Sequence, residues 1–147
     1  MGQKKVITKS EPTTEGAETK APVSVSKKNP KKQIINGVAY ITVSYNNTMV
    51  AIADTKGEVL AWSSAGSIGF KGSKKSTPYA ANLVAKTAVE KAKKYNLMNL
   101  KIVVKGVGPG RESAIRGLAG SGLAVTSIVD KTPIAHNGVK SPKPRRV

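Results

Sequence analysis

Apolar and polar residues alternate along the stretch from Gly37 to Tyr45. One set of alternate positions carries small and branched apolar side chains, namely Ala39, Ile41 and Val43. A period of two, with branched and aromatic residues on both sets of positions, is typical of a β-strand. Because Asn46 and Asn47 follow, the pattern predicts a strand that ends in a tight turn.

Two more short apolar runs continue this pattern. The first spans Met49 to Asp54, and the second spans Val59 to Ser64, after the turn residues Thr55, Lys56 and Gly57. Apolar runs joined by short turns predict a three-stranded antiparallel meander. Trp62 lies inside the third strand, and we expect it to belong to the core rather than to a stacking surface.

The period changes after Thr77, which suits a helix N-cap and is followed by Pro78 at the first helical position. The apolar residues downstream repeat at helical spacing and share one face, and they are Ala81, Val84, Ala85, Ala88, Ala92 and Tyr95. The opposite face carries several lysines. We expect those lysines to form a solvated surface and no part of a binding site.

Three further elements complete the pattern. They are a strand from Leu100 to Lys105, a helix from Arg111 to about Gly120, and a strand from Val125 to about Ile128. The order is therefore β-β-β-α-β-α-β. Because right-handed crossovers make the last strands parallel, the sequence predicts an α/β fold with a mixed five-stranded sheet and helices packed on it.

The two ends of the chain differ from this body. Residues 1–32 are rich in charged and small polar residues, and we expect a disordered basic extension. Residues 33–131 are predicted to form one globular domain. Residues 132–147 contain Pro133, Pro142 and Pro144 among basic residues, and this composition predicts an extended basic tail.

Positive charge dominates the chain, with 25 Lys and Arg against 8 Asp and Glu, a net charge of +17 and a pI of 10.2. The excess extends through body and tails, and it favours a polyanionic partner. No apolar stretch approaches the roughly 20 residues that span a bilayer, so no membrane partner is expected. Without cysteine and with His136 as the single histidine, a zinc site is excluded, and no cofactor is expected.

A glycine-rich turn follows the fourth predicted strand, in the stretch from Lys105 to Leu118. Its glycines leave room for an anion beside the backbone, and the helix start and Arg111 add positive charge. This arrangement suits phosphate. A strand-to-helix connection that simply needs glycine explains the same residues, and the turn alone does not separate the two interpretations.

A second basic segment spans Ala65 to Ser76 and combines three glycines, three serines and three lysines with Phe70. Its composition suits neither strand nor helix and predicts a mobile basic loop. Serine hydroxyls and lysines contact phosphate and sugar oxygens, and Phe70 offers a surface for stacking on a base. In the first hairpin Asn46 could contact a nucleotide, whereas the turn itself is the favoured explanation for Asn47.

Catalysis is disfavoured by the distribution of acidic residues. The first strand carries no acid, Asp54 and Glu58 flank a turn, and Glu90 lies on a lysine-covered helix face. A divalent-metal nuclease of ribonuclease H-like fold is therefore the weaker alternative, because it needs clustered carboxylates. Recognition of folded RNA by shape and backbone is favoured over DNA, since no base-reading recognition helix is present. A basic protein-interaction scaffold is the third interpretation.

Four spaced motifs carry a resemblance to a known family. They are S-Y-N-N-T at Ser44–Thr48, A-G-S-I-G-F-K-G-S-K-K-S-T-P at Ala65–Pro78, G-P-G-R-E-S at Gly108–Ser113 and D-K-T-P-I-A-H-N-G at Asp130–Gly138. Together they resemble the family of bacterial small ribosomal subunit protein eleven, over about Lys31 to Val147. Val107, Ile68 and Ala135 depart from the usual family pattern, and none of these departures removes a charge.

The resemblance implies a structural, non-enzymatic protein of the ribosomal small subunit, located in the cytoplasm within the ribosome. It implies small-subunit rRNA, platform proteins seven and eighteen, and mRNA near its exit as partners, and no homo-oligomer. It also implies a ribonuclease H-like sheet without the nuclease site. The predicted RNA contacts are Asn46, Phe70, Lys71, Ser73, Lys74, Lys75, Gly108, Gly110, Arg111, Arg116, His136, Asn137, Lys140, Lys143, Arg145 and Arg146.

Overall fold

A computed structural model of the chain describes residues 33–143, so the predictions for residues 1–32 and 144–147 lie outside the described part. The elements in chain order are β1 (Asn36–Ser44), β2 (Asn47–Asp54), β3 (Val59–Ser64), the 3-10 helix η1 (Gly72–Ser76), α1 (Pro78–Ala92), the 3-10 helix η2 (Lys93–Tyr95), β4 (Asn99–Lys105), α2 (Arg111–Ala119) and β5 (Ala124–Asp130). The predicted order β-β-β-α-β-α-β is confirmed.

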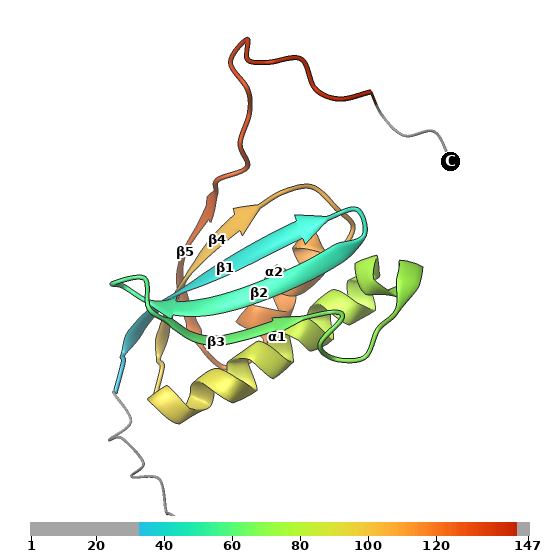
Figure 1. Cartoon of the computed structure of the whole chain (residues 1–147). Coiled ribbons are helices and arrows are strands. Elements are labelled where there is room, and N and C mark those ends of the chain that lie inside the picture. The colour runs from blue at the N-terminus through green and yellow to red at the C-terminus, as the bar shows by residue number, and fades with distance from the viewer. Residues whose placement is uncertain (1–32, 144–147) are drawn as a thin grey trace, which may run out of the picture.

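The five strands form one mixed sheet in the order β3-β2-β1-β4-β5 (Figure 1). β1 pairs antiparallel with β2, and β2 pairs antiparallel with β3, as the predicted meander requires. β4 pairs parallel with β1 on its other side, and β5 pairs parallel with β4. The crossover through α1 therefore carries the chain from one edge of the meander to the far side of β1.

One face of the sheet and the two helices enclose the core. α1 packs against β2, β3 and α2, so both helices lie on the same side of the sheet. The alternation predicted for β1 is confirmed, because Ala39, Ile41 and Val43 are buried on the helix side. Fully burying a side chain such as Ile41 contributes about 1.5–3 kcal/mol, so this layer stabilises the fold and fixes the register of β1.

α1 begins where the sequence predicts. The Ala80 N–H donates to the Thr77 Oγ1 at 3.3 Å, and Pro78 occupies the first helical position. All five of the helical positions predicted for the buried face of α1 are buried, and Ala80 and Val89 join them. Tyr95 is only half-buried, because the helix tightens into η2 before reaching it.

Two predictions about the meander are wrong. Trp62 is 55% exposed, because its side chain lies on the sheet face opposite the helices. The first turn consists of Tyr45 and Asn46, while Asn47 already belongs to β2 and pairs with Ser44. The turn therefore lies one residue earlier than predicted, and the Asn47 N–H donates to the Ser44 Oγ across it at 3.1 Å.

The segment between β3 and α1 is also more regular than its composition indicates. The prediction that it contains no helix is wrong, since residues Gly72–Ser76 form η1. Three strands are longer than predicted: β2 begins at Asn47, β4 begins at Asn99, and β5 spans Ala124–Asp130.

Within the described range, no helix is long and apolar enough to cross a membrane.

Candidate nucleic-acid interface

The segment 65–76, which we call the basic loop, is closed by short hydrogen bonds. The Ser67 Oγ donates to the Ser64 carbonyl oxygen at 2.8 Å, and the Ser64 N–H donates to the Ser67 Oγ at 2.9 Å. The Phe70 N–H donates to the Ala65 carbonyl oxygen at 3.1 Å. These bonds fold residues 64–70 into a turn directly before η1, which contains Lys74 and Lys75 and has Lys71 at its N-cap.

Three lysines of the basic loop face the solvent. Lys71 and Lys74 are exposed, Lys75 is partly exposed, and none of them forms an ion pair with another described residue. Ser73 lies among them and is exposed as well. The basic loop therefore presents uncompensated positive charge together with hydroxyl groups, which is the chemistry that contacts phosphate and sugar oxygens.

Phe70 anchors the basic loop to the body. Its ring is partly buried against the core and meets the Tyr79 ring edge-on, with centroids 6.2 Å apart. Such aromatic pairs contribute about 0.5–1.5 kcal/mol beyond the area they bury. The structure thus shows a packing role for Phe70, and base stacking by this residue stays a prediction.

The glycine turn at residues 106–110 passes over the hairpin formed by β1 and β2. Gly106 has φ +96°, and a Cβ at this position would collide with the Val43 carbonyl oxygen. A Cβ on Gly108 would lie 2.5 Å from the Ser44 carbonyl oxygen, and one on Gly110 would lie 2.5 Å from the Thr48 Oγ1. Packing alone therefore requires glycine at these three positions. The phosphate contacts of Gly108 and Gly110 stay predictions.

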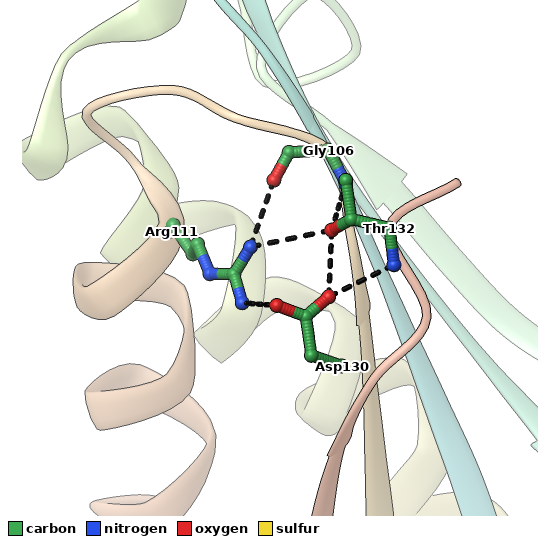
Figure 2. Close-up of polar contacts among 4 residues, drawn as sticks. All are labelled: Gly106, Arg111, Asp130 and Thr132. Atoms are coloured by element: carbon green, nitrogen blue, oxygen red, sulfur yellow. Dashed lines mark hydrogen bonds and ion pairs between the residues drawn. The ribbon is translucent and has the colours of Figure 1, made fainter. Parts of the chain in front are cut away.

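Arg111, the first residue of α2, holds three parts of the chain together (Figure 2). Its Nη1 donates to the Gly106 carbonyl oxygen at 3.0 Å and to the Thr132 Oγ1 at 3.4 Å, and its Nη2 forms an ion pair with Asp130. The side chain is 31% exposed. The sequence predicted a phosphate contact from an exposed helix start, whereas the structure shows a guanidinium engaged by its own chain.

Asp130 and Thr132 complete this cluster, which we call the tail clamp and define as Gly106, Arg111, Asp130 and Thr132. The Thr132 hydroxyl donates to the Asp130 Oδ1 at 2.6 Å, and the Thr132 N–H donates to the same oxygen at 2.9 Å. The Gly106 N–H donates to the Thr132 Oγ1 at 3.2 Å. The clamp therefore ties the end of β5 to the glycine turn at the point where the C-terminal tail leaves the body (Figure 1).

Hydrogen bonds from Thr132 and then from Arg111 lower the pKa of the Asp130 carboxyl from its ordinary 3.8 to about 2. Both partners bind the ionised form, so the carboxylate is favoured. The sequence analysis did not predict the roles of Asp130 and Thr132 in this cluster. The local signal for their hydrogen bond is the spacing Asp130-Lys131-Thr132, because an Asp side chain commonly bonds the backbone N–H two residues further on.

The remaining predicted contacts are spread over the surface. Arg116 forms an exposed i,i+4 ion pair with Glu112 at 3.2 Å, and both side chains are 80% exposed. Asn46 is exposed at the hairpin tip. In the tail the exposed residues are His136, Asn137, Lys140 and Lys143, while Arg145 and Arg146 lie outside the described residues. The structure brings Arg111 to the glycine turn but does not bring all the predicted contacts into one site.

Acidic and histidine side chains do not gather into a metal site. Among residues 33–143 there is no group of three or more His, Cys, Asp or Glu that could hold a metal ion. Asp54 is buried at the end of β2, where its Oδ1 accepts from the Thr55 N–H at 2.6 Å. The positive charge, by contrast, is exposed on several separate segments.

The sequence was also compared with known proteins. The family model for ribosomal protein S11 matches residues 37–146. The chain belongs to the ribosomal protein S11 family. The small ribosomal subunit protein uS11 of Wigglesworthia glossinidia brevipalpis is 53% identical over 124 residues, which cover 84% of this chain and 95% of that protein.

Membership in this family confirms two predictions made from the motifs. The chain is a structural constituent of the small ribosomal subunit, and it is not an enzyme. Its partners are accordingly ribosomal RNA and other ribosomal proteins, and its location is the ribosome.

Proposed function

We propose that this chain binds small-subunit rRNA through phosphate contacts and shape, and that it organises the platform of the small subunit near the mRNA exit path. The observation that carries the proposal is the basic loop. Lys74 and Lys75 lie in η1 and Lys71 directly precedes it, after a turn closed by hydrogen bonds between Ser64 and Ser67, and no described acidic residue forms an ion pair with these lysines. Preorganised cations lose less conformational entropy on binding than cations on a flexible segment.

Additional contacts extend this surface. Arg116 on α2, Asn46 at the hairpin tip and the exposed basic tail lie on separate segments, which suits a large folded RNA better than a small ligand. In this proposal the tail runs toward the mRNA exit, and proteins seven and eighteen of the platform are the protein neighbours. The chain acts as a single copy in the cytoplasmic ribosome rather than as a homo-oligomer.

The tail clamp gives Arg111 a place in this function. Because its guanidinium bonds Gly106, Thr132 and Asp130, its main contribution is to set the direction in which the basic tail leaves β5. A phosphate contact from its remaining donors is an addition to that role. Clamping the first residues of the tail reduces the volume that its cations explore, and so raises their effective concentration at the RNA.

Charge neutralisation at matched sites tests the proposal. The variant with Lys71, Lys74 and Lys75 changed to Gln is compared with a control in which Lys86 of α1 and Lys93 and Lys94 of η2, outside the basic loop, are changed to Gln. Both variants lose the same charge, and all six positions are at the surface. Affinity for small-subunit rRNA is measured by filter binding at one fixed salt concentration.

The loop variant is expected to bind rRNA at least about tenfold more weakly than the control, since charge-assisted hydrogen bonds contribute roughly 1.5–3 kcal/mol each. Thermal unfolding of both variants should match that of the unmodified chain, because exposed lysines contribute little to stability. Equal losses of affinity in the two variants would show that total charge, and not the basic loop, carries the binding.

A further inference from the structure

The face of the sheet that carries no helix, which we call the open face, is crossed by a row of apolar side chains. Cα pairing places Trp62 opposite Ala51, Ala51 opposite Tyr40, Tyr40 opposite Val103, and Val103 opposite Val129, so one residue comes from each of the five strands. Trp62 is 55% exposed and Tyr40 is 43% exposed. Two of the six aromatic residues of the chain therefore lie in one row on a face that no helix of residues 33–143 covers.

A shallow depression of about 260 Å³ lies on this face beside Tyr40. Its lining residues are Tyr40, Ile41, Thr42, Val103, Lys105 and Lys131. Val103 forms the floor, since it is only 6% exposed although its side chain is on the open face. The depression is slightly smaller than the roughly 300–1,000 Å³ of pockets for drug-sized ligands, and so suits one ring system.

Two cations border the depression without a compensating acid. Lys105 pairs in register with Thr42, and Lys131 follows β5 directly, so both approach from the same end of the strands. Neither forms an ion pair with another described residue. Asp130 directly precedes Lys131, but its carboxylate is bonded by Arg111 and Thr132, and Glu112, the acid nearest to Lys105 in sequence, is paired with Arg116.

The position of Lys131 is fixed on both sides. Its own N–H donates to the Val104 carbonyl oxygen at 2.8 Å, and the next residue, Thr132, is part of the tail clamp. The lysine is therefore presented by backbone that cannot swing away from the sheet. A side chain with a fixed base pays less entropy when it binds an anion.

From this arrangement we propose that the open face binds one unpaired nucleotide of RNA, with its base against Tyr40 and Val103 and its phosphate between Lys105 and Lys131. An aromatic ring on an exposed sheet, bordered by cations, is the chemistry by which sheet surfaces bind single-stranded RNA. A protein segment is the less favoured occupant, because lysine is depleted at the centre of protein interfaces. This inference rests on the proposed rRNA binding and adds to it a site outside the basic loop.

The test uses the full-length chain and two probes, a single-stranded RNA octanucleotide of mixed sequence and small-subunit rRNA. Tyr40→Ala removes the ring, Tyr40→Phe keeps it, and Met49→Ala is the control on the same face, because Met49 is equally exposed but does not line the depression. Affinity for the octanucleotide is measured by quenching of intrinsic fluorescence, and thermal unfolding checks that each variant folds.

Tyr40→Ala should weaken octanucleotide binding by about 5- to 150-fold, since alanine substitution at a stacked base costs roughly 1–3 kcal/mol. Tyr40→Phe and Met49→Ala should stay within about twofold of the unmodified chain. A double-stranded octamer should bind no differently to any of these variants, because its bases are already stacked.

A second variant keeps the proposal testable if Tyr40→Ala does not fold. Changing both Lys105 and Lys131 to Gln alters only exposed residues, and should weaken octanucleotide binding at least about fivefold more than changing Lys86 of α1 and Lys94 of η2. Unchanged octanucleotide affinity in both the Tyr40→Ala and the double lysine variants overturns the site.

The outcome separates this inference from the proposed function. If the chain binds rRNA through its basic loop but the open-face variants bind the octanucleotide and rRNA normally, only the nucleotide site is wrong. If the unmodified chain fails to bind rRNA at all, the proposed function fails first. If Tyr40→Ala leaves all RNA binding unchanged but abolishes the retention of a neighbouring protein in reconstituted subunits, the open face is a protein interface and the nucleotide site is rejected.

Discussion

Replacing Gly106 by alanine tests why the turn after β4 is rich in glycine. The sequence left two explanations, a cradle for phosphate and a connection that needs glycine. The structure gives the second a physical basis, because Gly106 has φ +96° and a Cβ there would collide with the Val43 carbonyl oxygen. If packing is the reason, the substitution should destabilise the protein in the absence of RNA.

A matched control separates backbone strain from collision. Gly57 in the turn before β3 has φ +92°, but no atom lies within 4 Å of the position that its Cβ would occupy. For either glycine, alanine at positive φ costs about 1–2 kcal/mol, and the loss of unfolded-state entropy returns about 0.4–1 kcal/mol. Gly57→Ala should therefore lower the free energy of unfolding by no more than about 1.5 kcal/mol.

Gly106→Ala carries the same strain together with the collision against the β1 backbone. Forcing extra atoms into a packed site costs typically about 1–3 kcal/mol, and the direct collision with a backbone oxygen places Gly106 in the upper part of that range, so the total destabilisation should be about 2–4 kcal/mol. For a domain of this size, each kcal/mol lowers Tm by roughly 4–8 °C. We expect Gly106→Ala to lower Tm by at least about 8 °C, and Gly57→Ala by clearly less.

Thermal unfolding of the full-length chain, followed by circular dichroism without RNA, measures both values. Urea unfolding gives the free energies independently of the heat-capacity correction. Equal destabilisation by the two substitutions would refute the collision argument. A fully stable Gly106→Ala variant that had lost rRNA affinity would favour the phosphate cradle instead.

The other predictions concern the tail clamp and the helices. The pKa of the Asp130 carboxyl is lowered in the folded protein, so the carboxylate stabilises the fold above about pH 4, and this stabilisation is lost as the pH falls through about 2. Between these two pH values the urea midpoint should therefore fall less in Asp130→Asn than in the unmodified chain. An identical fall would contradict the clamp. Arg111→Gln should accelerate amide hydrogen exchange at Thr132 while the core of the sheet remains protected, and unchanged exchange would mean that the guanidinium does not hold the tail. Leu118→Ala should destabilise the fold by about 2–5 kcal/mol in urea unfolding, since Leu118 of α2 is fully buried in the core, and a loss below about 1 kcal/mol would show that α2 is loosely docked. Thr77→Ala should cost about 1 kcal/mol through the lost cap of α1, and an unchanged midpoint would show that the cap is dispensable.

Local patterns predicted the elements because each pattern has a local cause. The alternation of β1 and the Thr77-Pro78 start of α1 depend on side chains within a few residues of each other. Boundaries were less accurate, because they depend on partners that lie far away in the sequence. Asn99 enters β4 by pairing with Asn36, and no local signal at Asn99 indicates that pairing.

Residues whose environment depends on topology were harder to place. Trp62 was expected in the core, but the face to which a strand residue points is set by where the helices pack. Arg111 was expected to be free for phosphate, but β5 brings Asp130 beside it through parallel pairing with β4. The row from Trp62 to Val129 likewise exists only once the order of the five strands is known.

The central claim is that this chain holds small-subunit rRNA mainly by contacts to phosphates, and the salt dependence of binding tests it most directly. The affinity of the full-length chain for small-subunit rRNA should fall linearly on a plot of log affinity against log salt concentration, with a slope of about −0.7 to −0.9 for each phosphate contacted. With at least the three lysines of the basic loop engaged, we expect a slope steeper than about −2, reduced in magnitude by about 2 to 3 when those lysines are changed to Gln. An affinity that does not change with salt, or a slope that is unaffected by removing these lysines, would contradict the account.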